Sequence, residues 1–263
     1  MAKPTPLSAA KITLSAFNDV LGKYPSCIQS ISQDKGAKPG QKTLAELDEY
    51  RYDEAVTCFG SKKAGTKSMG IDEVKTLVEW KLRHGKFRPT LMNLVSSNDP
   101  ELVRSTVQDA IKQYRDKSDV SGALAILTKL KGIGPATASL LLAVHDPDHV
   151  IFFADEAFYW LCGGGEKVPL KYNVKEYNSL CEASQKLSQR LGVKAIDIER
   201  VAFVLMRQES GDVAAASATL DPEPPVSSVA KVTPPKTKRK KAADEDANEP
   251  EQPVRRSKRT KRS

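Results

Sequence analysis

The stretch Leu130–Leu161, "LKGIGPATASLLLAVHDPDHVIFFADEAFYWL", contains two features that decide how the rest of the chain is interpreted. It begins with a short glycine-containing turn, Lys131–Pro135, between two apolar segments of helical periodicity. Near its end an aspartate, Asp155, follows the apolar run Val150–Ala154. The turn is either a simple link between helices or a site for a phosphate. The aspartate is either a helix cap or a group directed at a sugar.

The chemistry of the turn suits an anion. Gly132 and Gly134 lack a Cβ, so both can adopt positive φ and a large anion can approach their backbone closely. Pro135 presets φ for a first helical turn. The helix that follows then directs its positive end, with the free amides of Ala136 and Thr137, at whatever lies in front of the turn.

The residues around the turn extend this prediction. Ile133 is expected to point inward and hold the loop, while Lys129 and Lys131 add positive charge. The stretch "LKGIGPATASLLLA" resembles the helix-hairpin-helix motif, in which a Gly-apolar-Gly turn holds one DNA phosphate through backbone amides. The matching residue types are those at Leu130, Gly132, Ile133, Gly134, Thr137 and Ala138. The alternative is a plain turn between two helices that happens to contain glycines.

The position of Asp155 extends the resemblance to the helix-hairpin-helix DNA glycosylases, the superfamily of endonuclease III and the 3-methyladenine glycosylases. In these enzymes an aspartate follows the hairpin at a similar spacing, after an apolar connector, at the start of the next helix. The resemblance implies that Asp155 lies near C1′ of a flipped nucleotide, stabilises the cationic sugar and helps to position the attacking water. A fixed carboxylate in a dry pocket strongly stabilises the oxocarbenium-like sugar that forms when a base departs.

The resemblance also implies a limit on the chemistry. Lyase-competent members carry a lysine at the second position after the second hairpin glycine, and Ala136 occupies that position here. Schiff-base chemistry requires an amine, so any activity is expected to be monofunctional. Lys131 lies nearby in sequence, but the sequence does not give its geometry. The resemblance covers residues 121–162 well and the rest only as a similar succession of helices.

A structural role for Asp155 is the alternative. It precedes the predicted helix "EAFYWLC", and aspartate is a favoured N-cap. Capping and catalysis are compatible, because the family aspartate also lies at a helix start. Glu156 is unusual at its position and can be simply a first-turn acid favoured by the helix dipole.

Helical periodicity extends through the chain up to about residue 210. Asp99–Pro100 is predicted to start one helix and Gly192 to end another. Val150–Phe153 is the best candidate for a strand, with a buried extended connector as the alternative. We therefore predict one all-α domain over residues 1–210.

A basic segment lies in this domain at residues 79–91, "EWKLRHGKFRPTL". Its cations are predicted to contact DNA phosphates, with a solvated helix end as the alternative. Its two aromatic residues either stack on a base or belong to the core. His84 is expected at the surface. The predicted phosphate contacts are Lys81, Arg83, Lys86 and Arg88.

Residues 211–263 have a different composition, with prolines, small residues, charge blocks and no aromatic residue. Such a segment cannot bury enough apolar surface to offset its ordering entropy, so we predict a disordered tail. Its basic clusters, Lys238–Lys241 and "RRSKRTKR", are typical of nuclear localisation signals. We expect a nuclear protein that binds an import receptor, with a merely solvating tail as the alternative.

Composition bounds the remaining possibilities. The net charge of +8 is compatible with an acidic partner. The cysteines Cys27, Cys58, Cys162 and Cys181 are far apart and are expected to be reduced and mostly buried. His145 and His149 are separated by Pro147, so a shared metal site is not expected. No apolar run approaches the ~20 residues of a membrane span. We expect a soluble intracellular monomer without cofactor, metal or membrane partner.

Two functions follow from these observations. The first is a nuclear monofunctional DNA glycosylase that binds double-stranded DNA and flips a damaged or mismatched base out of the helix. In it, Asp155 is catalytic, while Gly132, Gly134, Ala136 and Thr137 hold a phosphate. The second is a non-catalytic chromatin or repair protein that uses the same hairpin only to bind DNA or a partner.

Overall fold

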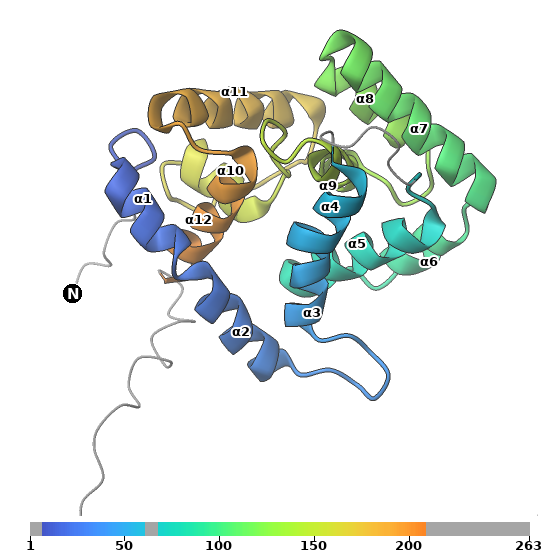
Figure 1. Cartoon of the computed structure of the whole chain (residues 1–263), viewed down its shortest axis with the longest axis horizontal. Coiled ribbons are helices and arrows are strands. Elements are labelled where there is room, and N and C mark those ends of the chain that lie inside the picture. The colour runs from blue at the N-terminus through green and yellow to red at the C-terminus, as the bar shows by residue number, and fades with distance from the viewer. Residues whose placement is uncertain (1–6, 61–67, 209–263) are drawn as a thin grey trace, which may run out of the picture. The chain divides into compact units, whose positions relative to one another are not determined.

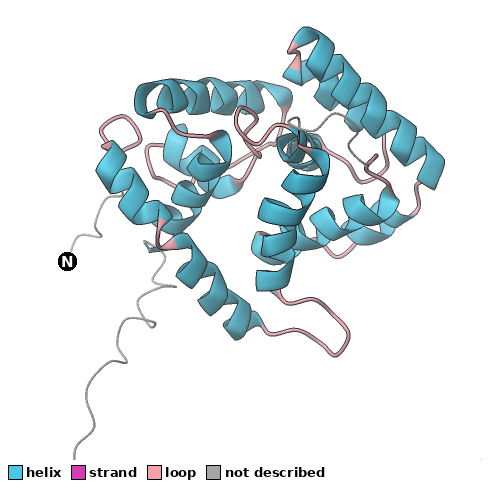
Figure 2. Cartoon of the chain, in the orientation of Figure 1, coloured by secondary structure: helices cyan, strands magenta, loops and turns pink. Residues whose placement is uncertain are grey.

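The computed structural model describes residues 7–60 and 68–208, all within one unit, Met1–Asp221. Every regular element in these two ranges is a helix, which confirms the all-α prediction (Figure 2). The predicted tail lies outside them. The helices are α1 (Leu14–Leu21), α2 (Tyr24–Lys35), α3 (Leu44–Glu49), a π-helical turn (Tyr50–Glu54), α4 (Ala55–Phe59), α5 (Ile71–His84), α6 (Leu91–Ser96), α7 (Pro100–Lys117), α8 (Val120–Leu127), α9 (Pro135–His145), α10 (Asp155–Leu161), α11 (Val174–Leu191) and α12 (Ala195–Gln208).

The predicted helix ends are confirmed. The Asp99 side chain accepts hydrogen bonds from the amides of Glu101 and Leu102 at the start of α7, and Pro100 is its first residue. At the end of α11, Gly192 adopts φ 70° and its amide donates to the Ser188 carbonyl. These ends are local in origin, which is why sequence reasoning located them.

Helix α9 is the centre of the domain. Every residue after Pro135 in this helix is buried, and the helix packs against α4, α5 and α8 (Figure 1). A helix that is apolar around its whole circumference must be enclosed by other elements. The turn that precedes α9 is therefore attached to a helix that is enclosed in the core.

After α9 and a turn at residues 147–149, the extended segment Val150–Ala154 leads into α10, and no strand occurs in the described part of the chain. Side chains from three helices satisfy its backbone instead. The Phe152 amide donates to Glu199 Oε1 at 2.6 Å, and the Phe153 amide donates to Ser139 Oγ at 2.9 Å. The Ile151 carbonyl accepts from the Tyr177 hydroxyl at 2.9 Å. The segment is thus a buried connector, held so that α10 begins at a fixed point.

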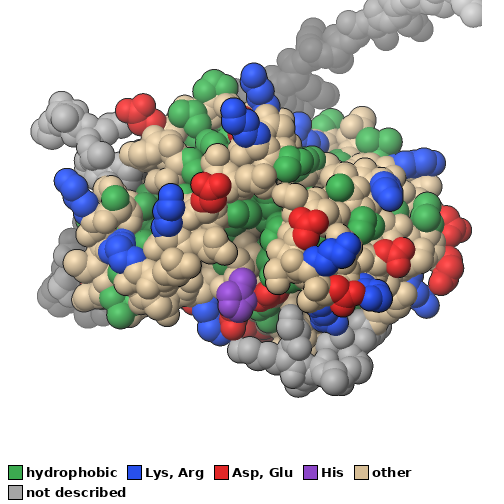
Figure 3. All heavy atoms as spheres, turned by 90° about the horizontal axis from the view of Figure 1, so that it is seen from above, with side chains coloured by type: hydrophobic (Ala, Val, Ile, Leu, Met, Phe, Trp, Pro, Cys, Tyr) green, Lys and Arg blue, Asp and Glu red, His purple; other side chains and the backbone are tan. Residues whose placement is uncertain are grey.

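The surface has mixed charge. On the face in Figure 3, basic and acidic side chains are interspersed, so positive charge does not gather into one field there. Within the described residues no helix combines the length and apolar character needed to cross a bilayer.

Candidate functional site

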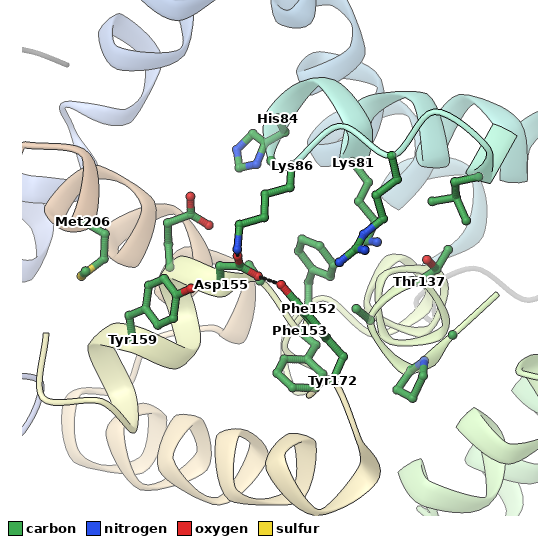
Figure 4. A pocket seen from close by; sticks show the side chains of 18 of the residues that line it. Lys81, His84, Lys86, Thr137, Phe152, Phe153, Asp155, Tyr159, Tyr172 and Met206 are labelled. Carbon is green, nitrogen blue, oxygen red and sulfur yellow. Dashed lines mark hydrogen bonds and ion pairs between the residues drawn. The ribbon is translucent and has the colours of Figure 1, made fainter. Parts of the chain in front are cut away.

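A cavity of about 520 Å³ lies where five parts of the fold meet (Figure 4). Its walls come from the end of α5 with the loop that follows it, the turn before α9, the connector with the start of α10, the loop before α11 and the end of α12. Gly132, Gly134, Ala136 and Thr137 line this cavity together with Asp155. The turn and the aspartate, separated in sequence, therefore face one space.

Asp155 is not a helix cap. The N-cap of α10 is Ala154, whose side chain makes no capping hydrogen bond, and Asp155 is the first helical residue. The capping alternative is therefore wrong. The Asp155 carboxylate is 17 % exposed; Oδ1 accepts from the Tyr172 hydroxyl at 2.6 Å and Oδ2 pairs with Lys86 Nζ at 2.8 Å (Figure 4). The carboxylate is thus held in the cavity by two donors from other segments.

Tyr172 is a site residue that sequence reasoning missed. Its backbone φ is 55°, an uncommon conformation for a residue with a side chain and a strain found at functional sites. Burial, and then the hydrogen bond to Asp155, raise the pKa of Tyr172 to about 12, so the phenol stays protonated and donates. The Arg88 guanidinium lies 5.6 Å from the centre of its ring. The sequence does not indicate the hydrogen bond between Tyr172 and Asp155, because it joins two separate segments. Nor does the residue type tyrosine indicate a positive φ.

The two glycines of the turn have different roles. Only Gly132 adopts positive φ, at 77°, whereas Gly134 is the N-cap of α9 with φ −89°. The expectation that both exploit positive φ is therefore wrong for Gly134. A Cβ on Gly132 would lie 3.0 Å from Leu94 Cβ and from Val95 Cγ2 in α6. A Cβ on Gly134 would have no neighbouring atom within 4 Å. The first glycine permits close packing, and the second leaves the entrance open.

The amides of the turn are partly free. The Thr137 amide donates to the Gly134 carbonyl at 2.9 Å, which corrects the expectation that it is available. Among the described residues, the amides of Gly132, Gly134 and Ala136 have no hydrogen-bond acceptor. Unpaired amides beside a helix N-terminus are a suitable site for an anion.

The loop backbone is fixed on its other side. Asn98 accepts from the Lys131 amide at 2.8 Å and donates to the Lys131 carbonyl at 2.9 Å. Ile133 is 4 % exposed, which confirms that it points inward. The turn is therefore anchored before it meets a ligand, so that little ordering entropy remains to be lost on binding.

Three of the predicted cations line the cavity: Lys81, Lys86 and Arg88. The two lysines differ in electrostatic state. Burial, and then the Arg88 charge, lower the pKa of Lys81 to about 8. The hydrogen bond to Asp155 raises the pKa of Lys86. The cavity therefore holds one firmly charged ammonium and one amine that deprotonates readily.

The other predicted cations lie outside the cavity lining. Arg83 donates to the carbonyls of Lys42 and Gly36 and so ties down the loop between α2 and α3. Lys129 and Lys131 are exposed on the turn and remain candidates for phosphate contacts.

The two aromatics of the basic segment are in different environments. Trp80 is fully buried and its indole donates to Asp48 Oδ1 at 2.8 Å, whereas Phe87 is 73 % exposed. The surface prediction for His84 is wrong. Its ring is buried between Trp80 and Phe203, with ring centres 4.5 and 4.1 Å away. Burial lowers the pKa of His84 well below its usual value, so the imidazole is neutral.

Glu156 also lines the cavity, beside Asp155. Burial raises the pKa of its carboxyl, and the Arg207 guanidinium, 3.6 Å away, opposes this effect. The cavity therefore holds two neighbouring carboxyl groups with different partners.

The remaining candidate ligands do not form a metal site. Within residues 7–60 and 68–208 no cluster of His, Cys, Asp or Glu side chains could hold an ion. His145 is buried and bonds to the Leu141 carbonyl at 2.8 Å. All four cysteines are free thiols, as expected, but only Cys27 is buried, while Cys58 and Cys162 are exposed. The expectation of mostly buried cysteines is therefore wrong.

Comparison of this chain with protein-family models, with curated proteins and with solved structures finds no match.

Proposed function

We propose that the chain binds duplex DNA through the turn before α9, acting as a helix-hairpin-helix motif, and hydrolyses the N-glycosidic bond of a flipped nucleotide in the cavity. One observation carries this proposal: the Asp155 carboxylate faces the same cavity as the turn and is not used as a helix cap. A cavity of about 520 Å³ lies within the ~300–1,000 Å³ range of ligand sites and accommodates a nucleobase with its sugar.

The free amides of the turn hold a phosphate, and this contact fixes the position of the strand relative to the cavity. The target nucleotide rotates into the cavity, where Asp155 stabilises the positive charge that develops on the sugar. Tyr172 keeps one carboxylate oxygen oriented by its hydrogen bond. The second oxygen is then available to orient the attacking water.

Lys86 connects DNA binding to this chemistry. Its side chain is 67 % exposed, so its ion pair with Asp155 is only weakly stabilising and a DNA phosphate can compete for the ammonium. In the complex Lys86 moves to a phosphate oxygen and leaves the carboxylate to face the sugar.

Glu156 is the proposed general acid. A carboxyl whose pKa is raised by burial holds its proton to higher pH and can protonate the departing base, while Asp155 acts as the anion. This division assigns different roles to two adjacent carboxyl groups because their surroundings differ.

The direct test is a screen of the purified chain against duplex oligonucleotides that each carry one damaged or mismatched base, scored by alkaline strand cleavage. Asp155→Asn is expected to abolish base release and to leave DNA affinity unchanged or higher, because a negative charge near phosphates is removed. Asp109→Asn, at an exposed position on α7, is the matched control and should behave as the unaltered protein. Equal base release by Asp155→Asn would end the catalytic assignment.

A non-catalytic DNA-binding function is the second candidate, and the Lys86–Asp155 ion pair favours it, since the carboxylate is already partnered. This alternative predicts salt-dependent duplex binding without base release from any lesion.

We also propose that the basic clusters of the C-terminal segment bind an import receptor and place the protein in the nucleus. Deletion of the residues after Lys236, in a fusion too large to diffuse through nuclear pores, is expected to move the protein to the cytoplasm. Continued nuclear retention would contradict the assignment.

A further inference from the structure

We propose that Lys81 is the nucleophile of an abasic-site lyase activity in the same cavity. This inference rests on the proposed function for its substrate, an abasic deoxyribose in DNA. It departs from the expectation of a strictly monofunctional enzyme, which considered only the hairpin position of Ala136 and the neighbouring Lys131.

The position of Lys81 carries the argument. It lies in the last turn of α5, and its side chain extends toward the cavity that Asp155 and Thr137 also line (Figure 4). Among the described residues the Lys81 ammonium has no hydrogen-bond or ion-pair partner, and its charge interactions are longer-range ones with Arg88 and Asp155. A half-buried amine without a partner contributes little to the stability of the fold in its charged form.

The surroundings make this amine reactive. With the pKa of Lys81 near 8, about a tenth of the groups are unprotonated at pH 7, and only this form attacks a carbonyl carbon. Lys86 differs, because the hydrogen bond to Asp155 raises its pKa in the free protein and the phosphate contact favours its charged form in the complex. Burial beside a second cation is a known way to activate a lysine for Schiff-base chemistry.

The proposed hydrolysis supplies the matching electrophile. Cleavage of the N-glycosidic bond leaves a deoxyribose hemiacetal at C1′, which is in equilibrium with its open-chain aldehyde. This aldehyde forms inside the cavity that Lys81 lines, so the amine and the aldehyde are already close and no second binding event is needed.

The steps balance with water alone. The neutral Lys81 amine adds to the C1′ aldehyde to give a carbinolamine, which takes up a proton from solvent water, loses water and becomes a protonated imine. The Asp155 carboxylate accepts the C2′ proton, the electron pair forms the C2′–C3′ double bond, and the C3′–O bond breaks to release a 5′-phosphate strand end. Water then hydrolyses the imine, which restores the amine and frees the unsaturated aldehyde end.

The test uses the full chain and a duplex oligonucleotide with one preformed abasic site, so that base release is not required. Sodium borohydride reduces the imine and is expected to trap a covalent protein–DNA adduct, whose peptide mass locates the attachment at Lys81. Lys81→Met is expected to lose at least ten-fold in both trapped adduct and strand cleavage. Lys75→Met is the matched control: it lies on the same helix, pairs with Asp72 and is outside the cavity lining.

Binding of each variant to a duplex with a tetrahydrofuran abasic analogue, which has no aldehyde, separates loss of chemistry from loss of affinity. The cleavage rate of the unaltered chain is expected to rise with pH to a plateau, with its midpoint near pH 8. An adduct on another amine, equal trapping by Lys81→Met, or no adduct despite binding would overturn the proposal. Trapping at Lys81 without base release from any lesion would instead refute the glycosylase function and leave the lyase standing.

Discussion

The Arg51–Glu199 pair in the core and the Lys86–Asp155 pair at the cavity join the same kinds of charge in opposite surroundings. In the core pair, Arg51 Nη2 lies 3.3 Å from Glu199 Oε2, and the two side chains are 0 % and 2 % exposed. In the cavity pair, Lys86 Nζ lies 2.8 Å from Asp155 Oδ2, and the lysine side chain is 67 % exposed. The shorter pair has the weaker charge–charge attraction, because water and salt screen it.

The surroundings of each pair indicate what it does. Glu199 also accepts from the Phe152 amide, so the buried pair fixes the connector that leads to α10. The π-helical turn Tyr50–Glu54 places Arg51 in the core, where its Nε and Nη1 have no hydrogen-bond partner among the described residues. The core pair thus fixes geometry at an energetic cost, and the cavity pair can exchange partners.

The largest expected effect comes from breaking the core pair. Glu199→Ala leaves the Arg51 charge buried without its partner and frees the Phe152 amide, so we expect a loss of about 3–5 kcal/mol in the free energy of unfolding. Urea denaturation followed by circular dichroism measures this. A double variant, Arg51→Met with Glu199→Leu, removes both charges and should recover the part of the loss that comes from the unpaired charge, while the Phe152 amide stays without its acceptor. A double variant as unstable as the single one would show that the pairing of charges is not what matters.

The next effect concerns pH. Burial raises the pKa of Asp48 to about 6, even though Trp80 and Tyr24 donate hydrogen bonds to it. The pKa of Asp48 in the folded protein is above the ~3.9 of an aspartate in an unfolded chain. Between pH 6 and pH 4 the folded state therefore binds more protons at Asp48 than the unfolded state does. The free energy of unfolding therefore gains from this group as the pH falls from 7 to 4.

Asp48→Asn should flatten this part of the profile, measured as the midpoint of urea unfolding at pH 7, 6 and 5. The amide oxygen can still accept from Trp80, so the variant is expected to fold. The same slope in both proteins would contradict the assignment of a raised pKa to Asp48.

The smallest effect on stability is expected at the cavity. Lys86→Met breaks a pair whose cation is exposed and leaves Asp155 its hydrogen bond from Tyr172, so the free energy of unfolding should change by less than about 1 kcal/mol. DNA affinity should fall and its salt dependence should weaken by about one phosphate contact. Fluorescence anisotropy against salt concentration measures both. An unchanged salt slope would show that Lys86 does not exchange Asp155 for phosphate.

The residue types of the turn predicted part of its structure. The Gly-Ile-Gly pattern predicted a sharp bend with an inward Ile133, and Ile133 is 4 % exposed. The pattern did not predict that the two glycines have different roles, because Gly132 packs closely against α6, a segment distant in sequence. Likewise the basic segment indicated a cluster of cations but not that Arg83 turns away to bind loop carbonyls.

The sequence by itself determined the helical class and the helix ends at Asp99 and Gly192, because periodicity, caps and turns depend on neighbours along the chain. Only the tertiary structure decided which groups surround Asp155. Tyr172 and Lys86 come from segments far apart in sequence. The state of Lys81 likewise depends on how deeply α5 packs. Burial and distance set charge states, and neither is encoded in the order of residues over a short stretch.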